Sequence, residues 1–205
     1  AYTFCMCPGG TVVAAASEPG GVVTNGMSPF ARDGKNANSA LLVSVSPADF
    51  PGNDPLAGVR FQRQWERAAF ESGGGDFRAP AQLVGDFLAG RASAGAGDVR
   101  PSYLPGVEYT DLSKCLPDYT VASMRAAIAL FDRRLKGFAS PGAVLTGPET
   151  RSSSPLRIDR DARGEASVGG LYPCGEGAGC AGGILSAAVD GIRAAEALIT
   201  DGAIV

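Results

Sequence analysis

Apolar residues follow two different spacings along this chain, and each spacing predicts a different kind of element. In residues 1–46, short runs of small and β-branched apolar residues alternate with turn residues, as is typical of β-strands. Residues 11–16 and 21–25 flank a Pro-Gly pair and predict a hairpin, because Pro followed by Gly suits the two central positions of a type II turn. Residues 40–45 predict a further strand, which ends before Pro47.

Between residues 47 and 140 the apolar positions step by three and four, which is the spacing of amphipathic helices. One helix is predicted to begin at Asp54-Pro55, an N-cap residue followed by proline, and to end at the three glycines 73–75. A second helix is predicted from Asp118 to Gly137. Short strands are then expected at residues 144–146, 156–158 and 170–172.

A glycine-rich segment follows the last expected strand and precedes another amphipathic helix, predicted over residues 184–199. Five glycines and one acid lie between Gly175 and Gly183. A strand, a glycine loop and a helix start place unpaired backbone N–H groups around one point, where the helix dipole adds partial positive charge. The segment therefore predicts a site for phosphate or for a reduced cofactor ring. The alternative is a glycine-rich helix entry that serves only close packing of strand against helix.

Residues 177–182 match the dinucleotide-binding pattern G-x-G-x-x-G, but their surroundings differ from those of that fingerprint. The fingerprint opens a βαβ unit, and an acid about twenty positions later holds the ribose. Here Asp201 lies in the tail, without room for a second strand and helix, and an acid stands inside the loop at Glu176. We interpret the loop as a closing element of a nucleotide-binding domain.

Residues 171–179 resemble the C-terminal flavin motif of FAD-dependent oxidoreductases with a glutathione-reductase-type FAD domain. The whole chain is similar to the C-terminal halves of bacterial FAD-dependent dehydrogenases, which carry four motifs in one order. Here these motifs stand at residues 2–10, 25–28, 149–155 and 175–184. Two features depart from the family pattern: Cys180 replaces an aromatic residue, and the N-terminal glycine fingerprint that binds the FAD pyrophosphate is absent.

The resemblance implies an α+β fold with two parts. Residues 1–144 would form a mixed β substrate domain with a helical insertion, β-rich over 1–46 and helical over 47–140. Residues 145–205 would supply the closing strand, loop and helix of an α/β FAD-binding domain. The chain begins without an initiator methionine, so we expect a longer protein whose N-terminal FAD-binding half is the partner of this chain.

The resemblance also implies FAD as the cofactor, with NAD(P)H as a candidate electron donor and an unidentified small molecule as substrate. The implied cofactor-binding residues are Gly175, Glu176, Gly177, Ala178, Gly179, Gly182, Gly183 and Ile184. In this interpretation Glu176 accepts a hydrogen bond from a ribityl hydroxyl, and the following helix start faces the flavin pyrimidine edge. Candidates that would face the substrate or the flavin are Arg151, Ser153, Cys5 and Cys7.

Each of these last candidates has a plainer alternative. The polar run at residues 149–155 is equally consistent with a solvated turn, whereas Arg151 in a functional loop would clamp an anion. Cys5 and Cys7 fit small apolar core positions as well as redox chemistry. The chain has no histidine, and its other three cysteines form no matching close pair, so no metal site is expected.

Composition narrows the function classes. With 45% hydrophobic and 19% charged residues the chain reads as a globular protein, and a net charge of −3 supports neither nucleic-acid binding nor attachment to an anionic membrane. No apolar run approaches the roughly 20 residues of a spanning helix, and five cysteines without regular spacing suggest a reducing, cytoplasmic setting. The sequence therefore predicts the C-terminal part of an FAD-dependent dehydrogenase without an assigned catalytic residue. The alternative is a non-enzymatic nucleotide- or partner-binding module.

Overall fold

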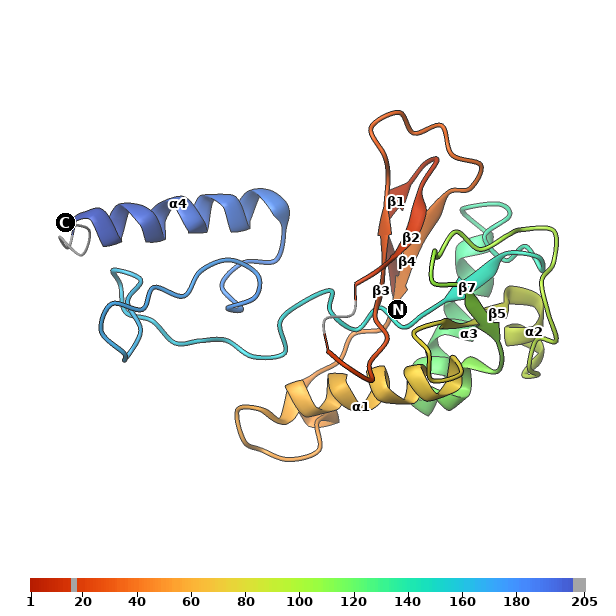
Figure 1. Cartoon of the computed structure of the whole chain (residues 1–205), viewed down its shortest axis with the longest axis horizontal. Helices are drawn as coiled ribbons and strands as arrows, with labels where there is room; N and C mark the ends of the chain where they lie inside the picture. The colour runs from red at the N-terminus through yellow and green to blue at the C-terminus, as the bar shows by residue number, and fades with distance from the viewer. Residues whose placement is uncertain (16–17, 201–205) are drawn as a thin grey trace. The chain divides into compact units, whose positions relative to one another are not determined.

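The structure is a computed structural model that describes residues 1–15 and 18–200, and its fold class is α+β, as predicted (Figure 1). Contacts divide the chain into two compact units. The first unit comprises Ala1–Asp49 and Arg63–Thr150, and the second comprises Phe50–Gln62 and Arg151–Val205. The substrate-domain and FAD-domain roles of the two predicted parts stay predictions.

Four strands of the first unit form two antiparallel pairs. The strands are β1 (Tyr2–Cys7), β2 (Thr11–Ala14), β3 (Thr24–Met27) and β4 (Asn38–Leu42), with β1 paired to β4 and β2 to β3. The predicted hairpin is confirmed: Gly20 has φ +75° and the Gly21 N–H donates to the Glu18 carbonyl over 3.2 Å, as in a type II turn. Strand β3 begins later than predicted, because Val22 and Val23 are buried core residues outside the ladder.

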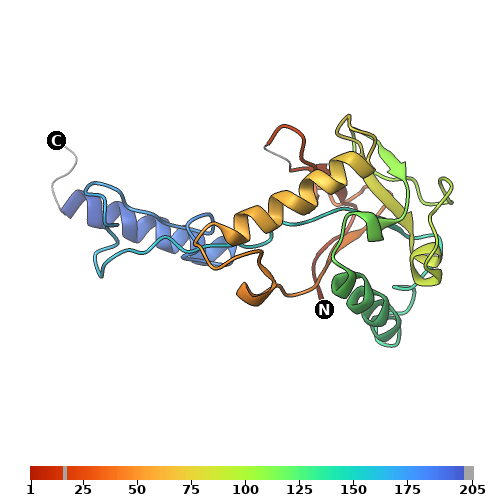
Figure 2. The same cartoon turned by 90° about the horizontal axis from the view of Figure 1, so that it is seen from below.

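A second, mixed sheet of three strands lies in the same unit. It has the order β6 (Val107–Tyr109), β5 (Ala79–Leu83), β7 (Val144–Thr146), with β6 parallel and β7 antiparallel to β5. Of these strands the sequence predicted only β7. In both views the short helix α2 (Val84–Ala89) lies beside β5 (Figure 1, Figure 2).

Helices α1 (Ala57–Ser72) and α3 (Asp118–Asp132) confirm the two predicted helices, and two 3-10 turns, η1 (Pro47–Asp49) and η2 (Leu112–Lys114), precede them. Helix α1 ends at the predicted glycines, and the Gly73 N–H still donates to the Ala69 carbonyl over 2.8 Å. Helix α3 ends five residues before the predicted Gly137. The reason is that the Asp132 carboxylate accepts hydrogen bonds from the Gly137 and Ala139 N–H groups and turns the chain.

The core of the first unit joins its helices to its sheets. One cluster of buried side chains lies at its centre: Val22, Ala69, Ala79, Val84, Phe87, Tyr103, Leu112, Cys115, Val121, Met124 and Ile128. Gln82 is fully buried among them, and its amide is satisfied by the Arg91 carbonyl at 2.7 Å and the Leu112 N–H at 2.9 Å. Burial, followed by the charge of Asp111, raises the pKa of the Cys115 thiol to about 12.

The second unit contains irregular chain over residues 151–183, followed by helix α4 (Ile184–Thr200). The strands expected at 156–158 and 170–172 are wrong, because neither segment forms a ladder with another described segment. Isolated hydrogen bonds hold this chain instead, such as that from the Ala166 N–H to the Leu171 carbonyl at 2.8 Å. None of the described helices combines the length and apolar character needed to cross a bilayer.

Candidate functional site

The glycine loop, residues 175–183, folds back on itself in the second unit. Gly175 and Gly179 both have left-handed backbone angles, with φ +74° and +72°. The Gly179 N–H donates to the Glu176 carbonyl over 2.9 Å, and the Cys180 N–H donates to the Gly175 carbonyl over 3.0 Å. Glycine at the two left-handed positions therefore allows a tight loop directly before α4.

Two contacts from the irregular chain fix the middle of this loop. The Ile158 N–H donates to the Ala178 carbonyl over 2.9 Å, and the Ser154 hydroxyl donates to the Gly177 carbonyl over 3.1 Å. Ala178 is buried. The middle of the glycine loop is thus attached to residues 154–158 by its carbonyl oxygens.

Helix α4 holds the start of the loop through an acidic residue that the sequence reading missed. The Asp190 carboxylate accepts the Gly175 N–H at 2.8 Å and pairs with the Arg160 guanidinium at 2.6 Å. The same guanidinium donates to the Pro173 carbonyl over 2.9 Å. We call Arg160, Asp190 and the Gly175 N–H the Asp190 clamp. The one sequence signal for Asp190 was an acid that follows the largely apolar residues 184–189 at the start of the helix.

The charges of the Asp190 clamp support each other. The Arg160 guanidinium, and then the Gly175 N–H, hold the pKa of Asp190 below its usual range. Asp190 in turn raises the pKa of Arg160. Both side chains are mostly shielded from solvent, so the attraction between them is less screened than in an exposed ion pair. The pair therefore holds the start of the glycine loop, at Gly175, against α4.

The glycines of the loop meet two different surroundings. A Cβ at Gly179 would lie 2.8 Å from Arg157 Cα and closer still to the Leu156 carbonyl oxygen, so the protein itself excludes a side chain there. At Gly177 and Gly182 no heavy atom of the described residues, apart from the glycine and its chain neighbours, lies within 4 Å of such a Cβ, and neither backbone is left-handed. Close approach of this chain therefore explains glycine at position 179 but not at 177 or 182.

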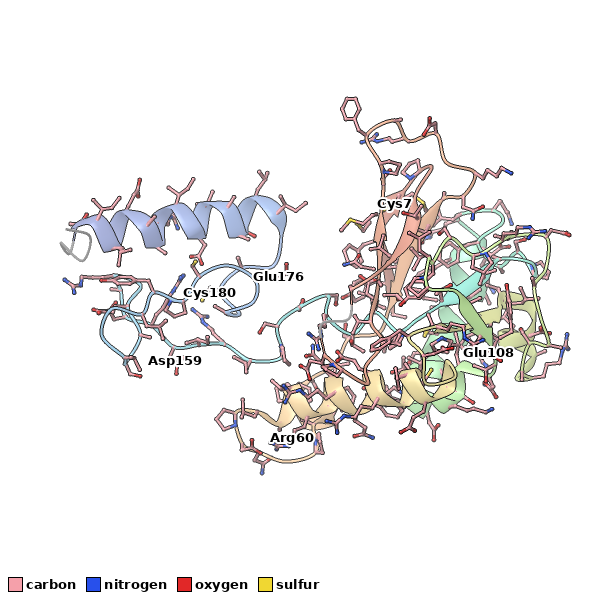
Figure 3. All side chains as sticks on the ribbon, viewed as in Figure 1. Cys7, Arg60, Glu108, Asp159, Glu176 and Cys180 are labelled. Carbon is pink, nitrogen blue, oxygen red and sulfur yellow. The ribbon has the colours of Figure 1, made fainter. Side chains whose placement is uncertain are left out.

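Three backbone N–H groups of the loop have no hydrogen-bond acceptor among the described residues. No residue in the described part of the chain accepts a hydrogen bond from the backbone N–H groups of Gly177, Gly182 or Gly183. Gly182 and Gly183 stand directly before α4, where the helix dipole adds positive character. The Glu176 side chain is exposed on the same loop (Figure 3). Donors beside one exposed acceptor fit a ligand that carries both phosphate and hydroxyl groups.

A hollow of about 360 Å³ lies between the end of the glycine loop and the first turns of α4. It is lined by Cys180, Ala181, Leu185, Ser186, Val189, Asp190 and Arg193. Cys180 is half-buried at its edge, and its thiol contacts the Ala178 carbonyl at 3.7 Å. A larger side chain at this position therefore has space within the second unit.

The apolar stripe of α4 has no partner among the described residues of its own unit. Ile184 is 91% exposed and Leu185 is 81% exposed, and Val189, Ile192 and Ile199 are also exposed. Only Ala194 of the helix is buried. The sequence correctly predicted the helix, but the face expected to pack is open in this unit.

The other predicted site residues lie in both units. Arg151 and Ser153 belong to the second unit and are exposed, and the Ser153 carbonyl accepts from the Gln62 amide over 3.5 Å. Cys5 and Cys7 belong to the first unit, where Cys5 is exposed and Cys7 is buried. No described group of three or more Cys, Asp or Glu side chains is placed to hold a metal ion.

The polar run at residues 149–155 begins as a packed segment. The Thr150 hydroxyl donates to the buried Glu66 carboxylate over 2.7 Å, and burial raises the pKa of Glu149. A solvated turn therefore does not describe its first two residues. No sequence pattern predicts this contact, because Glu66 is one of several polar residues on α1.

Comparison with known proteins places the chain in a family. The family model "FAD-dependent protein, C-terminal domain-like" matches residues 1–152, which covers the first unit. An uncharacterized protein of Clostridium beijerinckii is 58% identical over 199 residues, or 97% of this chain, and the chain spans 37% of that protein's length. The family match links the function of the chain to FAD. The chain belongs to the family of FAD-dependent protein, C-terminal domain-like sequences.

Proposed function

We propose that this chain is the C-terminal part of an FAD-dependent dehydrogenase and that its glycine loop binds the pyrophosphate–ribityl side of FAD. The carrying observation is the Asp190 clamp, which holds a loop with unpaired N–H groups at the start of α4. The family match covers residues 1–152 and not the loop itself, but it links the chain to FAD, and we therefore propose FAD as the ligand of this loop. The predicted glutathione-reductase-type domain is part of this proposal.

Four residues of the loop have a definite task in this proposal. The N–H groups of Gly177, Gly182 and Gly183 bind phosphate or ring oxygens, and Glu176 accepts a hydrogen bond from a ribityl hydroxyl. The start of α4 stabilises negative charge near its N-terminus through the helix dipole. When bound, FAD supplies the acceptor for a hydride, and NAD(P)H is the proposed donor.

The rest of such a protein would cover the exposed face of α4. The chain spans only 37% of its Clostridium relative, so that protein contains much additional chain. A helix with five exposed large apolar residues is suited to pack against another part of a domain. We propose the N-terminal FAD-binding half as this partner.

The flavin content of the full-length protein tests the proposal. We expect a visible flavin spectrum that bleaches when NAD(P)H is added without oxygen. Glu176→Ala should weaken flavin retention roughly 5- to 150-fold, because a ligand hydroxyl loses its acceptor. Glu196→Ala, an exposed acid on α4, is the matched control and should retain the flavin.

Two results would reject the proposal in different ways. A full-length protein that purifies without flavin and does not take it up would favour the non-enzymatic binding module. Equal flavin content in the Glu176→Ala and Glu196→Ala variants would place Glu176 outside the site. Residues 1–205 alone should not bind FAD with submicromolar affinity. A few hydrogen bonds worth about 0.5–1.5 kcal/mol each do not offset the roughly 4–15 kcal/mol of lost ligand freedom.

A further inference from the structure

Strand β1 contains an irregular step at Cys5-Met6-Cys7. Phe4 pairs with Ala40 and Cys7 pairs with Asn38, so three steps along β1 face only two along β4. The extra residue forms a β-bulge, and Cys5 within it has a left-handed backbone with φ +56°. Glycine adopts this conformation at lower cost than any residue with a Cβ, so a cysteine here is not explained by backbone preference.

Packing does not explain Cys5 either. Its side chain is exposed, and the neighbouring Phe4 and Met6 side chains are exposed as well. Cysteine that serves as a small apolar core residue is normally buried. Strained non-glycine residues that persist in structures cluster at functional sites, which makes the thiol of Cys5 the feature to account for.

The second thiol of the motif lies next to the first. The Cys7 thiol donates to the Cys5 carbonyl over 3.2 Å and interacts with the Cys5 thiol. Burial raises the pKa of the Cys7 thiol, and the Cys5 thiol and the Glu149 carboxylate raise it further. Cys7 is therefore protonated and shielded, whereas Cys5 is open to reagents from solvent.

We propose that Cys5 and Cys7 form a redox-active dithiol that low-molecular-weight disulfides oxidise to an intramolecular disulfide. In the first step the Cys5 thiolate bonds to one sulfur of the small disulfide, the S–S bond breaks, and one small thiol leaves with a proton. In the second step Cys7 loses its proton and its sulfur bonds to the Cys5 sulfur, which releases the second small thiol. Two protein thiols are oxidised and one small disulfide is reduced to two thiols.

The geometry favours a reversible reaction. A disulfide between residues two positions apart closes a very small ring, and strained, exposed disulfides are the more easily reduced ones. The adjacent thiols also make the second step intramolecular, so the mixed disulfide on Cys5 should be short-lived. This proposal concerns the first unit and does not depend on the flavin function of the glycine loop.

Oxidised glutathione is the probe for the test. The chain is incubated with it under native conditions, remaining thiols are alkylated, and peptides are mapped by mass spectrometry. We expect the wild type to form a Cys5–Cys7 disulfide that dithiothreitol reverses. Cys7→Ser should accumulate glutathione on Cys5 several-fold above wild type, and Cys5→Ser should leave Cys7 unmodified. Cys7→Ala gives a second trapping variant if serine disturbs the buried position.

An exposed cysteine outside the motif provides the control. Cys174 is exposed in the second unit, and Cys174→Ser should leave the Cys5–Cys7 result unchanged. The proposal is overturned if wild-type Cys5 carries as much stable glutathione as it does in Cys7→Ser. It is also overturned if Cys174 reacts while Cys5 stays unmodified, because Cys5 would then be an unreactive thiol.

Discussion

The two units of this chain are stabilised in opposite ways. The first unit has a core cluster of eleven buried residues, among them Phe87 and Ile128 with almost no exposed surface. The second unit buries only small residues and one proline among its described apolar side chains, namely Ala57, Pro173, Ala178 and Ala194. It places larger apolar side chains on the open face of α4. Its order comes from the Asp190 clamp and from hydrogen bonds to loop carbonyls.

This difference suggests that the first unit is stabilised by its own core, whereas the second unit is completed by contact with further chain. Apolar burial contributes most of the stability of ordinary domains, whereas single hydrogen bonds add about 0.5–1.5 kcal/mol each. The first unit therefore has what it needs to fold by itself. The second unit has a defined loop but a small core, which is the pattern of an element completed by further chain. Variants in the two units should consequently respond to different measurements.

The largest effect is expected from Phe87→Ala in the first unit. Phe87 is fully buried and stacks with the Arg125 guanidinium, whose carbon lies 5.1 Å from the ring centre. Truncation should lower the free energy of unfolding by about 3–5 kcal/mol in urea titrations of this chain. Phe30→Ala is the matched control, because its ring is fully exposed and its loss should change stability by less than about 0.5 kcal/mol. Equal changes in the free energy of unfolding for Phe87→Ala and Phe30→Ala would contradict the placement of Phe87 in the core.

Gly179→Val and Gly182→Val should differ in what they damage. Valine at Gly179 meets a left-handed backbone and residues 156–157, so it should destabilise the loop by at least about 1–2 kcal/mol and speed amide exchange over residues 175–190. Valine at Gly182 has open space and should leave exchange unchanged, but lower flavin content in the full-length protein. Cys180→Tyr should preserve both properties, since the hollow beside it can take the ring. Unchanged flavin in Gly182→Val would favour the simple helix entry.

Acid should release the Asp190 clamp. The pKa of Asp190 is depressed in the folded chain, so its contribution is present above the unfolded pKa of about 3.9 and is lost as the pH falls through the lower folded value. Protection of the Gly175 amide, relative to its intrinsic exchange rate, should therefore be constant from neutral pH to about pH 5 and fall at lower pH. Asp190→Asn should reduce this protection at neutral pH about tenfold. Protection that stays constant down to pH 2 would show that another contact holds the loop.

The smallest effect in this chain is expected from Ile192→Ala on α4. Its side chain is exposed, so stability of residues 1–205 should change by less than about 0.5 kcal/mol. In the full-length protein the same substitution should cost about 2–5 kcal/mol if the face is buried there. Thermal melting of both lengths makes the comparison, and equal small shifts would leave the α4 face without a partner.

Local patterns predicted the parts of the fold that depend on local spacing. Helices α1, α3 and α4 and the hairpin β2–β3 follow from apolar periodicity and a Pro-Gly turn. Strand β5 was missed because it contains Pro80, which normally excludes a run from a central strand, and because it pairs with a strand far along the chain. Only tertiary folding brings Arg160 and Asp190 together across 30 residues.

The same limit applies to the candidate site. The glycine loop was recognisable because its residues are contiguous and precede a helix. Which of its glycines serve the protein and which are open for a ligand depends on residues 156–157, whose approach no local pattern records. The contact between Thr150 and Glu66 was invisible for the same reason, since the two residues are 84 positions apart.

The burial of Cys115 makes its alkylation a measure of how often the core of the first unit opens. Its thiol is fully enclosed, contacts the Leu112 carbonyl at 3.5 Å and has a pKa of about 12, so alkylating reagents reach a reactive thiolate only when the core opens. Cys174 of the second unit is exposed and reacts without opening. Comparing the alkylation rate of Cys115 with that of Cys174 in the same sample therefore reports how frequently the core opens. No added label is needed.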